Sequence, residues 1–141
     1  LRREHVGFIF QHFNLVSTLT AEQNIMLPMK LAKRQVDQEL FNNVVERLGI
    51  KSRLSHKPHE MSGGQQQRVA IGRALVSSAP IVLADEPTGN LDEETTEEII
   101  QILKDVAHKD NKCVIVVTHS DRVAKAADVV YQLKDKTLIK K

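Results

Sequence analysis

The stretch Ser62-Gly63-Gly64-Gln65 has the residue types of a helix start that can hold an anion. Ser62 is a good N-cap, and Gln65 completes a capping-box pattern with it. The first N–H groups of a helix have no partner inside it and lie at the positive end of the helix dipole. Because Gly63 and Gly64 carry no side chains, another molecule can approach the backbone closely. The stretch therefore predicts phosphate binding, although many helices that bind nothing also begin after serine or glycine.

Two carboxylates, Asp85 and Glu86, directly follow an apolar run at 81–84. A second apolar run, at 113–117, is followed closely by His119. Such runs are typical of strands buried on both faces of a parallel sheet, and open α/β sheets bind ligands at the carboxyl ends of their strands. We therefore expect Asp85, Glu86 and His119 at one edge of a sheet. The alternative is that Asp-Glu-Pro only begins a turn and caps the next helix.

Apolar periodicity, caps and turn residues predict the elements that position these side chains. Strands are expected at 6–10, 81–85, 113–118 and 128–133, and helices at 21–33, 37–48, 62–77, 92–108 and 120–126. Strand–helix alternation at both ends of the chain indicates an α/β core with a parallel sheet. A helical stretch at about 17–76 interrupts this core, and the basic segment 134–141 is expected to form the exposed end of a hairpin.

Taken in chain order, these motifs resemble those of the ATPase domain of ABC transporters. Gln11 resembles the Q-loop, 61–65 the family signature with Met61 for the commoner Leu, 81–86 Walker B with its catalytic glutamate, 90–92 the D-loop, and His119 the H-loop. The Q-loop and segment 85–92 are most similar to those of exporters of the macrolide, antimicrobial-peptide and lipoprotein-release type. The resemblance covers nearly the whole chain.

The resemblance implies an α/β fold with a P-loop NTPase-like (RecA-like) parallel-sheet core, incomplete in this chain, and an inserted α-helical subdomain. Residues 1–16, with the Q-loop, would belong to the core. Residues 17–76 would form the helical subdomain, which ends in the signature helix. Residues 77–141 would complete the core with Walker B, the D-loop and the H-loop.

The resemblance also implies ATP and Mg²⁺ as cofactors and gives Glu86 and His119 catalytic roles. Glu86 would be the general base that orients or polarises the water attacking the γ-phosphate. His119 would hydrogen-bond that phosphate or hold Glu86 in position. Asp85 would hold Mg²⁺ directly or through water. Gln11 would be a weaker metal or water ligand, in a loop that reports the nucleotide state to a membrane domain.

In the family, the signature helix contacts ATP that is held by a second ATPase subunit, in a head-to-tail dimer. Ser62, Gly63, Gly64 and Gln65 would make that contact here. ATP would then bridge the two chains and stabilise the dimer by binding it preferentially. Asp92 would lie at the same interface, or would equally serve as the N-cap of the helix that follows it.

A Walker A phosphate loop does not occur in the sequence, because none of its 6 glycines is followed by lysine. We therefore expect the chain to be a C-terminal piece of a longer ATPase. Alone it would have little or no ATPase activity and weak nucleotide affinity, since no P-loop cradles the phosphates. Uncovered sheet edges and apolar faces would favour self-association.

The net charge of +2 and the dispersed basic residues do not favour a nucleic-acid partner. No apolar run approaches the roughly 20 residues of a membrane span, so a membrane role requires a transmembrane permease subunit as partner. The chain would then be cytoplasmic, peripheral at the inner face of the cell membrane. Cys113 lies in an apolar run and is expected to be a buried, inert thiol. The remaining histidines lack metal-ligand spacing and are expected at the surface or in packing: His5, His12, His56, His59 and His108.

The expected function is that of the ATP-binding and hydrolysing energy subunit of an ABC transporter, an exporter by its motifs, coupled to a separate membrane subunit. One alternative is a non-transport ABC-type ATPase acting in cell division, translation or DNA repair. Another is an interaction fragment without catalysis. Apolar residues near Gln11 either pack against the helical subdomain or form an exposed patch for the membrane subunit, and both possibilities stay open: Phe13, Leu15, Val16 and Leu19.

Overall fold

The structure, a computed structural model, describes residues 6–141. The first five residues of the expected core segment 1–16, including His5, lie outside the described residues. In chain order the elements are β1 (Val6–Phe10), α1 (Ala21–Leu31), α2 (Gln38–Leu48), the 3-10 turns η1 (Lys51–Arg53) and η2 (Pro58–Glu60), α3 (Gly63–Val76), β2 (Ile81–Asp85), α4 (Glu93–His108), β3 (Cys113–Val117), α5 (Asp121–Lys125), β4 (Tyr131–Lys134) and β5 (Thr137–Lys140). All five predicted helices are present, with ends shifted by two residues or fewer.

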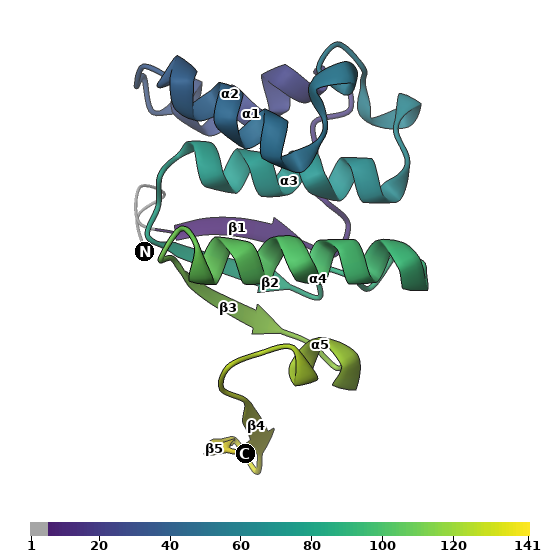
Figure 1. The fold of residues 1–141 in the computed structure, drawn as a ribbon, viewed down its shortest axis with the longest axis vertical. Helices are drawn as coiled ribbons and strands as arrows, with labels where there is room; N and C mark the ends of the chain where they lie inside the picture. The colour runs from purple at the N-terminus through teal and green to yellow at the C-terminus, as the bar shows by residue number, and fades with distance from the viewer. Residues whose placement is uncertain (1–5) are drawn as a thin grey trace.

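The core of the molecule is a parallel three-stranded sheet in the order β1-β2-β3, with helices on one face. The register aligns Phe10, Asp85 and Val117, so the three strands end at the same level. Figure 1 shows α3 and α4 along this sheet, with α1 and α2 in a further layer on the outer side of α3. The predicted α/β core with a parallel sheet is therefore confirmed.

The helices hold their places through the apolar stripes predicted from the sequence. On α2 the buried residues are Phe41, Val44, Val45 and Leu48. On α4 they include Ile99, Ile100, Leu103 and Val106. Gly49 ends α2 in the left-handed conformation, with φ 65°, which glycine adopts without steric cost.

Helix α3 lies unusually close to the sheet at Gly7. A Cβ added to Gly7 would stand 2.9 Å from the Cβ of Ala74 and 3.0 Å from its backbone oxygen. Only a residue without a side chain permits this approach of strand β1 to the backbone of α3. The contact therefore sets the distance between the helix that begins at Ser62 and the sheet.

The other face of the sheet is open, which contradicts two expectations. Strand β3 was expected to be buried on both faces, but Ile115 is 47% exposed and Val117 is 55% exposed. Cys113, expected to be buried, is exposed as well. Side chains alternate along a strand, and the covering helices α3 and α4 lie on the face of Val114 and Val116. Cys113, Ile115 and Val117 consequently point away from them.

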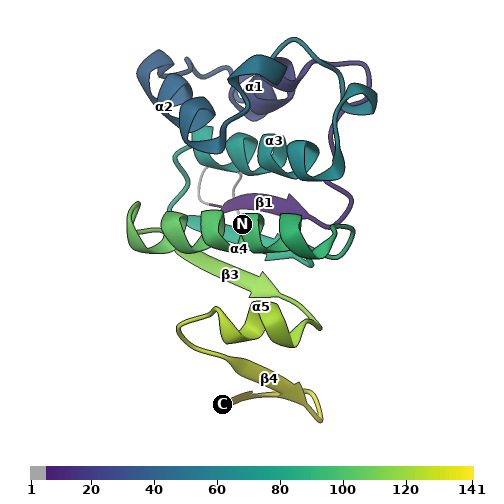
Figure 2. The same cartoon turned by 45° about the vertical axis from the view of Figure 1, so that its right-hand side comes forward.

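The expected strand at 128–133 is also wrong in its extent. Strand β4 begins at Tyr131 and pairs only with β5, in an antiparallel hairpin. Asp135 and Lys136 both have positive φ at the turn, as a two-residue hairpin loop of type I′ requires. Figure 2 shows α5 and this hairpin beyond β3, on the side away from the helical layers. The predicted exposed hairpin end is confirmed.

In the part of the chain that the structure describes, no helix has the length and apolar character that a membrane crossing would need.

Candidate active site at the carboxyl edge of the sheet

The residues that could do chemistry gather where the strands end. In Figure 1 the arrowheads of the parallel strands, the start of α3 and the start of α4 all lie on the same side of the molecule. The shared register of the strands places Asp85 and the residues after β3 at one level. The expectation that the two strand ends meet at one edge is confirmed by the contacts below.

Glu86 is fixed to the end of β3 by three hydrogen bonds. Its backbone N–H donates to the backbone oxygen of Val117 at 2.8 Å. Its Oε1 accepts from the backbone N–H of His119 at 2.7 Å, and its Oε2 accepts from the Thr118 hydroxyl at 3.2 Å. The backbone of Glu86 has φ 46°, a left-handed conformation that costs a non-glycine residue about 1–3 kcal/mol. The surrounding contacts thus hold a strained residue with its carboxylate oriented.

The side chains of His119 and Asp85 remain accessible beside this carboxylate. The Nε2 atom of His119 lies 4.0 Å from Oε1 of Glu86, and the ring is fully exposed. Asp85 is exposed, and its carboxylate makes no hydrogen bond with any residue in 6–141. An exposed carboxylate without a protein donor suits a hard cation that keeps most of its waters. Asp85 therefore fits as a single ligand of Mg²⁺, because residues 6–141 contain no group of three or more His, Cys, Asp or Glu side chains that could hold a metal ion.

The start of α3 has the predicted capping box. The Ser62 hydroxyl accepts from the backbone N–H of Gln65 at 3.2 Å, and the Gln65 side chain accepts from the Ser62 N–H at 3.0 Å. These bonds satisfy the third N–H of the helix and leave those of Gly63 and Gly64 at its open end. An anion would find two backbone donors there.

The two glycines also have a packing role that sequence reasoning missed. A Cβ on Gly64 would stand 2.5 Å from Cγ2 of Thr95 on α4. A Cβ on Gly63 would stand 3.3 Å from Cδ2 of Leu91. The glycines therefore let the N-terminal ends of α3 and α4 come together, in addition to leaving the backbone of α3 open.

Gln11 is engaged with the segment before α4. Its Nε2 donates to Oδ1 of Asn90 at 3.3 Å, and its backbone oxygen accepts from Nδ2 of Asn90 at 3.2 Å. A Cβ on Gly89 would stand 2.6 Å from the Gln11 amide, so the two segments are in close contact. Among residues 6–141, no hydrogen bond joins Gln11 to Asp85. The side chain of Gln11 thus contacts the D-loop-like segment rather than Asp85.

Asp92 is the N-cap of α4, one of the two roles expected for it. Its carboxylate accepts from the backbone N–H of Thr95 at 2.8 Å. Hydrogen bonds from the side chain and the backbone of Thr95 lower the pKa of Asp92 below its usual range. The cap is therefore ionised at neutral pH and complements the positive end of the helix dipole.

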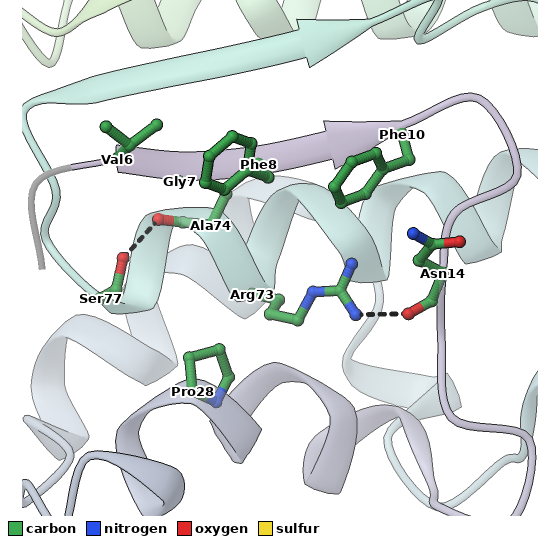
Figure 3. Close-up of a pocket in the computed structure, with 9 residues that line it drawn as sticks. All are labelled: Val6, Gly7, Phe8, Phe10, Asn14, Pro28, Arg73, Ala74 and Ser77. Carbon is green, nitrogen blue, oxygen red and sulfur yellow. Dashed lines mark hydrogen bonds between the residues drawn. The ribbon is translucent and has the colours of Figure 1, made fainter. Parts of the chain in front are cut away.

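The segment after Gln11 is held down by Arg73 of α3. The guanidinium donates to the backbone oxygens of Phe13 at 2.9 Å and Asn14 at 2.8 Å, two residues with positive φ. Burial lowers the pKa of Arg73. Figure 3 shows this arginine beside a cavity of about 220 Å³ between β1, α3 and Pro28 of α1. This largely apolar cavity lies along β1, and none of the predicted site residues lines it.

The loop after Gln11 is neither fully buried nor fully exposed. It was expected either to pack against the helical subdomain or to form an exposed patch, and neither holds entirely. Leu15 packs against the core. Val16 is exposed, whereas Phe13 and Leu19 are half-buried. Asn24 of α1 ties this loop down by accepting from the Val16 N–H at 2.7 Å and donating to the Val16 oxygen at 3.2 Å. The loop is therefore partly packed and partly free.

A buried glutamine, Gln67, completes the site's framework and was also missed. Its Nε2 donates to the backbone oxygens of Phe10 at 3.1 Å and Pro87 at 2.5 Å. The sequence did carry a signal, because Gln67 lies in helical register with the buried residues Ile71 and Ala74. A polar residue on a buried stripe needs a partner.

The chain belongs to the ABC transporter family, whose profile matches residues 1–89 of the 141. It is 45% identical over 141 residues to the macrolide export ATP-binding/permease protein MacB of Shewanella sp. (strain W3-18-1), covering 99% of this chain and 22% of that protein. It is 44% identical over 142 residues to the uncharacterized ABC transporter ATP-binding protein YvrO of Bacillus subtilis (strain 168), covering 99% of this chain and 61% of that protein.

Solved structures agree with this assignment. A dimeric post-hydrolysis structure of the ATP-binding cassette MJ0796, bound to ADP and Pi, superimposes with a TM-score of 0.80 at 43% identity. The match covers 97% of this chain and 62% of that one. The fold is therefore that of an ABC ATPase cassette, and the chain spans less than two thirds of the length of each of these three proteins.

Proposed function

We propose that this chain carries the hydrolytic and signature motifs of the ATP-hydrolysing component of an ABC exporter. The observation that carries the proposal is the fixed carboxylate of Glu86, which accepts from His119 N–H and the Thr118 hydroxyl beside the exposed Asp85. A base that is oriented before substrate arrives loses little entropy in the reaction. Glu86 is the general base, and the His119 imidazole contacts the γ-phosphate or supports Glu86.

Asp85 holds Mg²⁺, with Gln11 as a weaker ligand once its amide leaves Asn90. When bound, Mg²⁺ supplies positive charge that offsets the charge developing on the phosphate oxygens. Ser62, Gly63 and Gly64 present the open end of α3 to ATP of a second subunit, and Gln65 supports them through the capping box. Asp92 lies close to this end, because α3 and α4 meet at Gly64 and Thr95.

The partners proposed are a second ATPase subunit, arranged head to tail, and a transmembrane permease. The dimeric MJ0796 cassette supports the first, and the name ATP-binding/permease protein of MacB supports the second. In this proposal the chain works at the inner face of the cell membrane. Residues 17–76 form the helical subdomain, which the packing of the outer helices α1 and α2 against α3 supports, and 1–16 with 77–141 form the core.

Hydrolysis is tested by ATPase assay of the chain extended at its N-terminus with a segment that carries a Walker A phosphate loop, Gly-x4-Gly-Lys-Ser/Thr. The extended protein is expected to hydrolyse ATP, and Glu86→Gln is expected to lower kcat about 100-fold or more. The matched control is Glu46→Gln, an exposed residue of α2. The chain without the extension is expected to show little activity.

If Glu86→Gln hydrolysed ATP as fast as the extended wild type, Glu86 would not be the general base. No hydrolysis by any extended chain would favour the interaction fragment. Co-purification with a multi-span membrane protein separates the transporter component from a non-transport ATPase, since only the former has a permease partner.

A further inference from the structure

Gln67 is the most deeply buried polar side chain near the site, and its hydrogen bonds join three elements. It lies in the second turn of α3 and has no exposed surface. Its Nε2 reaches Phe10 at the end of β1 and Pro87 after β2. The helix that begins at Ser62 is thereby linked to the start of the Gln11 loop and to the turn that carries Glu86.

While the Gln67 side-chain nitrogen donates these two hydrogen bonds, its side-chain oxygen is left without a donor in the described part of the chain. Oε1 of Gln67 is buried and accepts no hydrogen bond from residues 6–141. A buried acceptor without a donor lowers stability. A methionine would fill similar space without an orphaned atom, but it would give the Pro87 oxygen no donor. Packing alone therefore does not explain a glutamine here, whereas bridging two loop carbonyls does.

We propose that Gln67 is a positioning residue, which keeps the Gln11 loop and the Glu86–Pro87 turn in fixed relation to the signature end of α3. A displacement of α3 then moves both loops together, because one amide group holds both carbonyls. This inference rests on the proposed function, since only hydrolysis at Glu86 gives the positioning a catalytic consequence.

Hydrogen exchange of the 141-residue chain provides the first test. Three reporter amides lie in the linked loops: Phe13 N–H bonded to Phe10 O, Gly89 N–H to Glu86 O, and Leu91 N–H to Thr88 O. In Gln67→Met these amides are expected to exchange roughly tenfold faster, because two hydrogen bonds are lost. The exchange rate of the Phe41 amide of α2 is expected to be unchanged. In the control Gln101→Met, on the exposed surface of α4, the exchange rates of the three loop amides and of the Phe41 amide are all expected to be unchanged.

The wild-type chain gives a second measurement that needs no variant to fold. The side-chain amide protons of Gln67 are expected to exchange at least roughly tenfold more slowly than those of exposed Gln101. Equal rates would overturn the proposal. The proposal would also be overturned if Gln67→Met raised the exchange rate of the Phe41 amide as much as the rates of the loop amides, because that pattern reports global unfolding.

The catalytic consequence is measured in the chain extended with a P-loop segment. Gln67→Met is expected to lower kcat roughly tenfold while KM for ATP stays within about twofold, because orientation of Glu86 rather than nucleotide binding is impaired. An unchanged kcat would overturn the catalytic part of the proposal. If the extended wild type is itself inactive, the proposed function fails, and the hydrogen-exchange result still decides whether Gln67 positions the loops.

Discussion

The backbone N–H of His119 donates to Oε1 of Glu86 at 2.7 Å, across 33 positions of the chain. The imidazole is not part of this bond, since its Nε2 lies 4.0 Å from the same oxygen. The backbone therefore orients the carboxylate, and the ring is free to meet a ligand. A substitution of the His119 side chain is therefore expected to leave the position of Glu86 intact.

Thr118→Val is expected to destabilise the fold by about 1 kcal/mol, because Glu86 Oε2 and the Ser120 N–H both lose the hydroxyl as a partner. His119→Ala is the matched comparison, and its effect is expected to stay within about 0.5 kcal/mol. Urea unfolding followed by circular dichroism measures both. A larger loss in His119→Ala than in Thr118→Val would contradict the assignment of Glu86 orientation to Thr118 and the backbone.

Gly64→Ala is expected to destabilise the chain by about 1–3 kcal/mol, because its new Cβ would lie 2.5 Å from Cγ2 of Thr95. Thr95→Ser removes that methyl group and keeps the hydroxyl. The double variant is therefore expected to recover most of the loss, which a double-mutant cycle from urea unfolding measures. Additive effects of the two substitutions would show that Thr95 is not the obstacle.

The cap of α4 is expected to weaken in acid. The pKa of Asp92 is lowered in the folded chain by its hydrogen bonds with Thr95. The stabilising effect of the ionised cap is thus fully present above the unfolded-state pKa, about 3.9. It is lost as pH falls through the lower folded-state value. An NMR titration of the Asp92 carboxyl carbon is expected to give a midpoint below the ordinary aspartate value of about 3.9. In Asp92→Asn the part of the loss of unfolding free energy in acid that comes from protonation of Asp92 is expected to be absent.

Ile115→Lys is expected to reduce self-association of the chain without unfolding it, since Ile115 is 47% exposed on the open face of the sheet. The control is Leu31→Lys, an exposed apolar residue at the end of α1. Size-exclusion chromatography with light scattering measures the mass of each variant. Equal association of Ile115→Lys and the wild type would show that the open face is not the contact surface.

Features set by short-range chemistry were predictable from the sequence. The capping box of Ser62 and Gln65 depends on residues within one helical turn, and it forms as expected. The gathering of Glu86 and His119 was predictable because parallel strands end at one edge. The individual roles of these residues in catalysis stay predictions.

Features set by long-range packing were not predictable. The apolar run at β3 does not indicate which of its faces a helix covers. The prediction that Cys113 is buried was therefore wrong. The sequence places Gln67 on a buried stripe, but its partners Phe10 and Pro87 lie 57 and 20 positions away. The engagement of Gln11 with Asn90 likewise depends on how two loops pack.

The contact of Gly7 with Ala74 is a point about which helix α3 could rotate relative to the sheet. Because only the Cβ of Ala74 lies between the strand and the helix here, α3 has no room to approach the sheet further and can only tilt or slide. Because the contact lies near the far end of α3 from Ser62, a small rotation about it would swing the signature end through a longer arc. The close approach of β1 and α3 at Gly7 would thus turn a small tilt of the helix into a larger displacement of its glycine-led end.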